Sequence, residues 1–361
     1  MLKSTIYAED ERRQKTSNIW QQIKLYRKKK DCTLEVLSER CGLSTSYCNC
    51  EVCNGCLQHT IVLCEVSMRK FLKILLGIIG LLIAAVILLL ATLTITDYRP
   101  ASTESAESSG SGSLSLATGT PIRMLTWNTG YGGLDADMDF FMDGGTMTFP
   151  SSQSVVENNV SAIASWLQQT NSDICLLQEV DRNSSRTKHL DELSLYQQIT
   201  GMDYSYAPNY RCLFVPFPLP PLGQMESGIV TLSSCLRADV STRVGLPSPY
   251  TWPVSTANLK RCLLVDRFPL TNSEKELVVI NLHLDAYESG EGRVAQTKAL
   301  LDLMADEYAA GNYCIAGGDF NQLFPDTKAI YPIKNTELWT PGGLTTDLLP
   351  DGWQFAFDSS T

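Results

Sequence analysis

The sequence predicts an α/β domain that follows a single membrane-spanning helix. From residue 121 onward, short apolar runs with strand character alternate with amphipathic helical patterns, which is typical of a domain built from both kinds of element. Before that domain, residues 74–95 form an unbroken apolar run that is longer than an ordinary core helix requires. The chain of 361 residues has room for one sizeable domain and shorter appendages.

The apolar run has the length and the flanks of a membrane anchor. At a rise of about 1.5 Å per residue, it spans roughly the 30 Å of a bilayer core. Arg69, Lys70 and Lys73 precede it, and such basic flanks stay on the cytoplasmic side. We therefore predict a single-pass anchor over residues 68–97 of a cell-membrane protein, with residues 74–95 in the lipid bilayer. The N-terminus is then cytoplasmic and the following domain extracytoplasmic.

Residues 1–67 form a basic, cysteine-rich extension that admits three interpretations. Residues 33–47 weakly resemble the helix-turn-helix of bacterial regulators, with Gly42 between two helical patterns. The next stretch lacks the basic residues of a DNA-reading helix, and its four cysteines could instead bind zinc. The third interpretation is a degenerate extension, with Met68 as the natural start. The four cysteines are Cys48, Cys50, Cys53 and Cys56.

Residues 98–120 predict a flexible linker. They are rich in Ser, Gly and Thr and carry almost no apolar side chains, so they have no means of forming a core of their own. We expect this linker to hold the next domain away from the membrane surface.

Residues 121–361 carry the pattern of the α/β domain. The predicted strands are residues 123–127, 174–178, 228–232, 262–266, 276–282 and 313–316, and the predicted helices are 155–169 and 292–308. Residues 216–221 (PFPLPP) predict a surface loop, because proline cannot donate to a strand ladder. This part of the chain has an odd number of cysteines, five, several of them in apolar strands. We therefore expect buried thiols and at most one disulfide.

Polar residues stand at the ends of four apolar runs. The runs end on Asn128, on Glu179, on His283, and on Asp319 followed by Asn321. Side chains alternate along a strand, so Asp319 and Asn321 point the same way. Four strand ends of this kind in one domain predict a cleft that binds a metal ion or a phosphate.

The motifs at these strand ends resemble the endonuclease/exonuclease/phosphatase superfamily, which includes deoxyribonuclease I. The resemblance rests on TWN at 126–128, LLQEVD at 176–181, SGIVTLS at 227–233, INLHLDAY at 280–287 and GGDFN at 317–321, in the family's order. It implies two packed β-sheets flanked by helices, with the site at one edge of the sandwich. It also implies a hydrolase of phosphoesters, of the nuclease, phosphodiesterase or phosphatase type, that depends on Mg²⁺, with Mn²⁺ or Ca²⁺ as alternatives.

The resemblance also implies a role for each motif residue. Glu179 binds the metal, and Asn128 holds the metal or a phosphate oxygen. Asp319 orients or deprotonates the attacking water, and Asn321 donates to the phosphoryl oxygens. His283 donates a hydrogen bond to a phosphate oxygen and stabilises the transition state. These roles match what phosphoester hydrolysis needs: a divalent cation, an activated water and donors that follow the developing charge.

Three further residues are candidates for substrate binding. Asp285 and Tyr287 follow the strand that ends on His283, and Arg186 lies just beyond the strand that carries Glu179. The expected substrate is a nucleic acid, a phospholipid head group or a small phosphate. The formal charge of −10 comes from the part after the basic N-terminal region, and an acidic domain argues against avid, non-specific binding of nucleic acid. No protein partner is indicated.

The last residues depart from the family pattern. The family ends its domain with a strand and an Asp-His pair, whereas this sequence reads FDSST at 357–361. We therefore expect an incomplete C-terminal part and weak activity, since losing a general acid/base typically costs about 10²- to 10⁴-fold in rate. Two alternative functions follow from the remaining features. One is an inactive remnant or binding module, and the other is a transmembrane regulator that reads DNA with its N-terminal region.

Overall fold

The computed structural model describes Val36 and residues 54–110, 116–234, 240–286, 290–325, 327 and 340–356, with only the backbone of 54–69. It divides into two compact units, Met1–Leu89 and Leu90–Thr361. Apart from Val36, the predicted helix-turn-helix lies outside the described residues, as do Cys48, Cys50, Cys53 and Tyr287.

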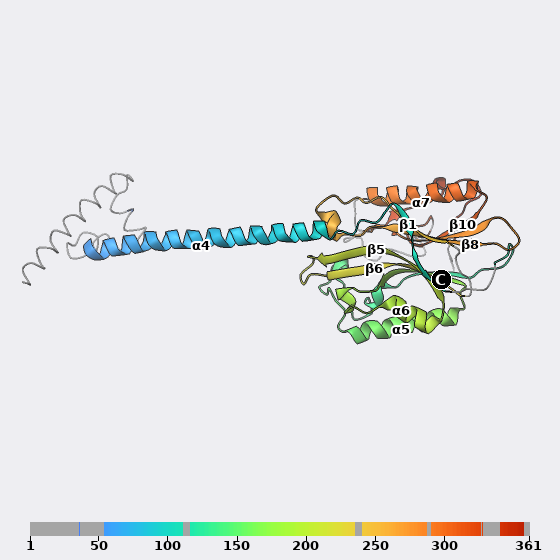
Figure 1. Ribbon diagram of the computed structural model, residues 1–361, viewed down its shortest axis with the longest axis horizontal. Helices are drawn as coiled ribbons and strands as arrows, with labels where there is room; N and C mark the ends of the chain where they lie inside the picture. The colour runs from blue at the N-terminus through green and yellow to red at the C-terminus, as the bar shows by residue number, and fades with distance from the viewer. Residues whose placement is uncertain are drawn as a thin grey trace, which may run out of the picture. The chain divides into compact units, whose positions relative to one another are not determined.

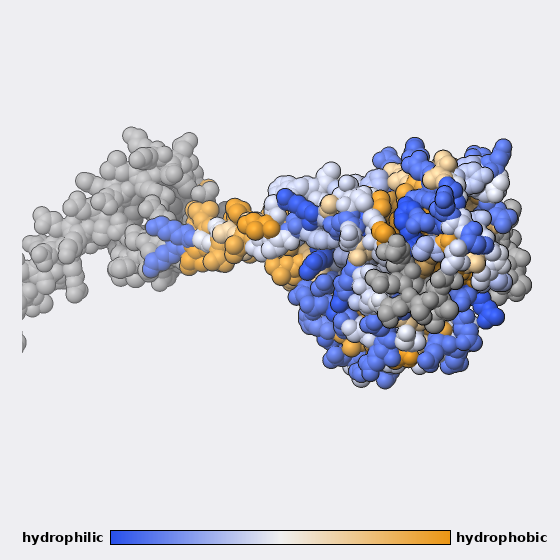
Figure 2. Space-filling view, turned by 45° about the vertical axis from the view of Figure 1, so that its right-hand side comes forward, coloured by the Kyte–Doolittle hydropathy of each residue, from blue (hydrophilic) through white to orange (hydrophobic). Residues whose placement is uncertain are grey.

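A long helix, α4 (Asn54–Ile95), contains the predicted anchor. Its segment Lys70–Ile95 is long and apolar enough to cross a membrane, and none of its most apolar stretch is buried inside the protein. Figure 2 shows the hydrophobic surface of this segment in orange. The side chain of Leu81 is 71% exposed, which is costly in water and favourable in lipid.

Two five-stranded sheets form the domain. One sheet has the order β1-β7-β8-β9-β10 and the other β2-β5-β6-β4-β3. The strands are β1 (Thr103–Ser105), β2 (Glu107–Ser109), β3 (Met124–Asn128), β4 (Ile174–Asp181), β5 (Asp203–Val215), β6 (Gly223–Ser233), β7 (Val240–Gly245), β8 (Cys262–Pro269), β9 (Glu276–His283) and β10 (Tyr313–Asp319), with the short pair β11 (Gln322–Leu323) and β12 (Gly342–Gly343). Helices α5 (Gln153–Thr170) and α6 (Glu192–Thr200) cover one outer face, and α7 (Glu291–Ala309) covers the other (Figure 1). This is the predicted sandwich.

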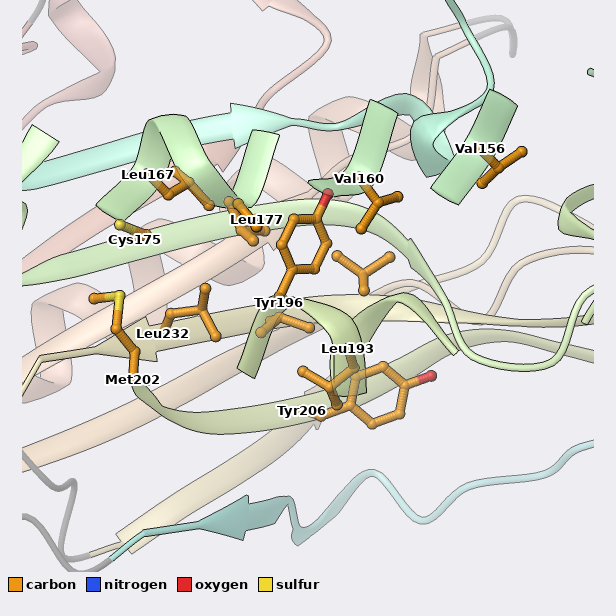
Figure 3. Close-up of a cluster of buried hydrophobic side chains, with 13 residues drawn as sticks. Val156, Val160, Leu167, Cys175, Leu177, Leu193, Tyr196, Met202, Tyr206 and Leu232 are labelled. Carbon is orange, nitrogen blue, oxygen red and sulfur yellow. The ribbon is translucent and has the colours of Figure 1, made fainter. Parts of the chain in front are cut away.

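The apolar patterns of strands and helices explain these layers. Strand β4 is buried along nearly its whole length, because one of its faces meets the other sheet and the opposite face meets α5 and α6. Helix α5 presents Val156, Val160 and Leu167 on one stripe, at the spacing of helical turns, and buries them against β4 (Figure 3). Tyr196 of α6 completes the same cluster, which closes this side of the sandwich.

The flexible linker predicted for residues 98–120 is wrong for the segment 103–109. Strand β1 pairs with β7 in one sheet, and β2 pairs with β5 in the other. The backbone N–H of Ala106, between them, donates to Ser241 O at 2.9 Å. A polar segment without a core of its own can still gain this order, because the edge strands β7 and β5 offer unpaired backbone groups.

All six predicted strands and both predicted helices are present. The structure adds β5, β7 and α6, which the sequence pattern did not predict. Residues 216–221 form the loop between β5 and β6, and its Leu219 is 86% exposed. Among the described cysteines, all four of the domain are free thiols. Burial raises the pKa of Cys175 and Cys262 to about 11, so these thiols are unreactive core residues, as predicted.

Candidate active site

Four predicted site residues meet at one edge of the sandwich. Strands β3 and β4 are parallel, as are β9 and β10, so the carboxyl ends of all four lie together. The amide of Asn128 on β3 donates to Glu179 Oε1 at 3.1 Å on β4 and to Asp319 Oδ2 at 2.9 Å on β10. His283 Nε2 on β9 lies 3.7 Å from the same Asp319 oxygen. One side-chain amide therefore joins carboxylates of both sheets.

The backbone is strained where it presents these groups. Glu179 has φ 58° and Asn321 has φ 51°, in the left-handed region that non-glycine residues rarely adopt. The ladder between β4 and β6 shifts its register between Leu177 and Val180, so Glu179 sits in a bulge. Such strain costs of order 1–3 kcal/mol per residue and gathers at functional sites. The strained backbone sets the direction of two predicted site residues, Glu179 and Asn321.

A close backbone approach explains the glycines before Asp319. A Cβ on Gly318 would lie 2.1 Å from Leu282 O, and the φ of Gly318 is +143°. No other residue fits this position without displacing β9. After it, Asn321 N donates to Asp319 Oδ1 at 2.9 Å, and Asn321 Nδ2 donates to Leu284 O at 2.9 Å. The backbone N–H of Asn321 thus fixes the Asp319 carboxylate. One of the two hydrogens of its side-chain amide is already donated to the backbone.

Arg186 lies beside the proposed metal-binding carboxylate. Its Nε and Nη2 each donate to an Asp181 oxygen at 2.8 Å, and its Nη1 is 3.7 Å from Glu179 Oε2. The guanidinium stacks 3.6 Å from the centroid of the Tyr131 ring. These contacts hold Arg186 rigidly, and Asp181 takes most of its hydrogen-bonding capacity. We infer that Arg186 acts mainly by positioning Glu179 and by its charge.

Asp285 has a different environment from the one expected of a substrate contact. It is only 3% exposed, and its oxygens accept from Arg261 Nε at 3.0 Å and from Gln296 Nε2 at 2.8 Å. Asp285 therefore orients Arg261. The buried Nη1 of Arg261 has no hydrogen-bond partner within the described part of the chain. A buried unpaired donor costs about 1–3 kcal/mol or more, so this atom favours an anionic ligand.

Sequence reasoning missed Arg261. The signal was a basic residue directly before the apolar strand β8, whose first residue lies at the active-site edge because β8 is antiparallel to β9. Its role depends on Asp285, which is distant in the sequence.

His283 is a neutral imidazole at neutral pH. Burial is the main reason that its pKa lies well below the ordinary value of 6.5, and the nearby positive charges of Arg261 and Arg186 lower it further. A neutral ring can donate a hydrogen bond through one nitrogen and accept through the other. It does not add a third positive charge to the site.

The carboxylates fit a hard cation that keeps part of its water. The side chains of Glu179 and Asp319 are 25% and 26% exposed, so their oxygens are accessible from solvent. Mg²⁺ is usually held by one or two carboxylates and several waters, which matches this donor set. Within the described residues there is no group of three or more His, Cys, Asp or Glu side chains that could enclose a metal. A fully protein-coordinated ion of the zinc type does not fit here.

Several solved structures are similar to this chain. TDP2 from Caenorhabditis elegans is 17% identical over 55% of this chain and 48% of its own, with a TM-score of 0.35. An endonuclease/exonuclease/phosphatase from Beutenbergia cavernae is 20% identical over 50% of this chain and 43% of its own, with a TM-score of 0.36. A mannosyl-6-phosphatase from Bacteroides thetaiotaomicron is 18% identical over 56% and 66%, with a TM-score of 0.37. The chain thus spans less than half the length of the first two.

The family model gives the assignment. No curated protein matches the chain. The model of the endonuclease/exonuclease/phosphatase family matches residues 125–361, which include every motif at the active-site edge. The chain belongs to the endonuclease/exonuclease/phosphatase family.

Proposed function

We propose that this protein is a membrane-anchored, metal-dependent phosphoester hydrolase. The observation that carries the proposal is the Asn128 amide, which bridges Glu179 and Asp319 beside the neutral His283. Family membership supports the reaction class, and the helix over Lys70–Ile95 supports the anchor. The basic residues before that helix favour a cytoplasmic N-terminus and an extracytoplasmic domain.

Each site residue has a distinct part in the proposed reaction. Glu179 and Asn128 would hold a divalent cation, which offsets the negative charge of a phosphoryl oxygen. Asp319, fixed by Asn128 and by the backbone of Asn321, orients the attacking water and accepts its proton. Neutral His283 donates to a phosphoryl oxygen whose negative charge grows in the transition state.

Two arginines complete the binding of an anionic substrate. Arg261, aimed by Asp285, offers an unpaired donor, and Arg186 contributes a fixed charge next to Glu179. Both guanidinium groups are largely buried, so their attraction for a phosphate is screened less than that of surface charges. The substrate classes that this arrangement favours are a nucleic acid, a phospholipid head group or a small phosphate.

Metal binding and turnover test the proposal together. We expect the detergent-solubilised full chain to bind Mn²⁺, followed by electron paramagnetic resonance, and to hydrolyse bis(4-nitrophenyl) phosphate. Glu179→Gln should weaken both. The matched control is Asp302→Asn, which removes an exposed carboxylate of α7 that is paired with Lys298. Wild-type Mn²⁺ binding in Glu179→Gln would show that Glu179 is not the ligand, whatever the rate.

A further inference from the structure

Helix α4 joins the domain through its C-terminal residues. Its last residues, from Leu90, belong to the same compact unit as the sandwich. Leu93 is only 4% exposed, and Trp252 Nε1 donates to Thr94 Oγ1 at 3.0 Å. Just after the helix, Asp97 Oδ1 lies 3.1 Å from Lys260 Nζ. Both partners, Trp252 and Lys260, belong to the loop between β7 and β8.

This loop lies at the active-site edge. Strand β8 is antiparallel to β9 and pairs Leu263 with Leu282, so the β7–β8 loop meets β8 beside the strand end that carries His283. The β5–β6 loop lies at the same edge, since β6 is antiparallel to β4 and pairs Ser227 with Asp181. The end of α4 that belongs to the domain's own compact unit, Leu90–Ile95, therefore lies at the edge that holds the candidate active site.

Large apolar side chains are exposed on these two loops and their flanking strand end. We call them the apolar rim, and they are between 37% and 86% exposed. The rim consists of Leu213, Phe214, Phe217, Leu219, Trp252 and Val254. Four of the six residues in the segment 216–221 are prolines, which have no backbone N–H. Few backbone donors would be left unpaired if this segment left water, so it suits a lipid interface.

The connection between the span and the domain is short and structured. Tyr98 OH donates to Glu104 Oε1 at 3.3 Å, and the Tyr98 ring lies beside the guanidinium of Arg243. Strands β1 and β2 then fasten the following residues to both sheets. The active-site edge is thus held close to the end of the apolar span.

We propose that the apolar rim inserts into the surface of the bilayer that α4 spans, so that the active site faces that membrane. This inference rests on the proposed membrane anchor and deepens the proposed function. It assigns phosphoesters presented at the membrane surface, that is, phospholipid head groups, as the substrate class. Contact with lipid explains why apolar residues are exposed beside the end of a membrane span, because it removes their apolar surface from water.

Photo-crosslinking of the full chain in vesicles tests the rim. Benzoylphenylalanine is placed at Phe217 of the rim, at Leu82 of the span, or at Tyr308, with the chain in vesicles of phosphatidylcholine and phosphatidylglycerol. Tyr308 is the matched control, because it is 64% exposed against 69% for Phe217 and lies at the C-terminal end of α7, next to the start of β10. That start lies at the edge opposite the active site.

The three positions separate the possible outcomes. Lipid adducts at 82 and 217, with none at 308, support the apolar rim. Adducts at 82 but none at 217 overturn the rim and leave the anchor intact, and an adduct to protein at 217 has the same meaning. Equal adducts at 217 and 308 overturn a specific orientation. No adduct at 82 overturns the anchor of the proposed function, and the rim with it.

Discussion

Both edges of the sandwich contain ion pairs between an arginine and carboxylates, but these ion pairs serve different purposes. At the edge opposite the site, Arg267 binds both Glu276 and Glu307, and Asn312 Nδ2 donates to Glu307 as well. At the active-site edge, Arg186 is bound just as fully by Asp181, yet the neighbouring Glu179 keeps its carboxylate accessible. In the first cluster every charged group is paired within the cluster, whereas the second holds Glu179, the proposed metal ligand, in place. Substitutions at the two edges should therefore separate stability from activity.

The largest effect is expected at Asp319. Asp319→Asn removes the group that we propose orients and deprotonates water, while its oxygen can still accept from Asn128. Hydrolysis of bis(4-nitrophenyl) phosphate should fall by about 10²- to 10⁴-fold, with little change in the melting temperature. Initial rates and thermal denaturation measure the two effects. A large fall in melting temperature would mean that Asp319 supports the fold as the opposite edge does.

A smaller loss of activity is expected at Arg186. Arg186→Lys keeps the charge but loses the fork that binds Asp181 and the stacking on Tyr131. Because this side chain positions Glu179, the affinity for Mn²⁺ and the rate should each fall by about 10- to 100-fold. Titration with Mn²⁺ and steady-state kinetics measure this. Unchanged Mn²⁺ affinity with a raised KM would instead assign Arg186 to substrate binding.

The opposite edge should give the reverse result. Glu307→Gln breaks a partly buried ion pair with Arg267 and should lower the free energy of unfolding by about 1–2 kcal/mol. The specific activity of the folded protein should not change. Denaturation with urea in detergent and the kinetic assay decide this together. A matching loss of activity would show that the two edges are coupled. It would contradict the view that the opposite edge supports only stability.

The smallest effect concerns pH. The pKa of His283 is lowered in the folded state by burial and by the two arginines, so the unfolded chain binds a proton near pH 6.5 that the folded protein does not. The free energy of unfolding should therefore fall as the pH drops below about 6.5. His283→Asn should flatten this slope, measured by urea denaturation at several pH values. An unchanged slope in His283→Asn would contradict this prediction.

The strand ends were predictable from the sequence because their signal is local. An apolar run that stops on Glu179 or His283 shows both the strand and the polar group at its end in a few residues. Arg261 was not predictable in the same way, because the contact that holds it is made with Asp285, which is distant in the sequence. Strands β1 and β2 were missed for another reason. These strands form because their backbone groups pair with the edges of two sheets. The Thr, Glu and Ser side chains of this segment do not indicate a strand.

The attachment of β1 and β2 has a mechanical consequence. Two strands that follow each other in the chain, with only Ala106 between them, are bonded to different sheets. A force that pulls the domain away from the proposed anchor first meets the contacts of Thr94 and Asp97 with the β7–β8 loop, then the β1–β7 ladder and then the β2–β5 ladder. The load passes into both sheets in turn before it reaches the strands that carry the site. A domain on a flexible linker would reorient under such a force. Here the strands β1 and β2 pass the tension to both sheets.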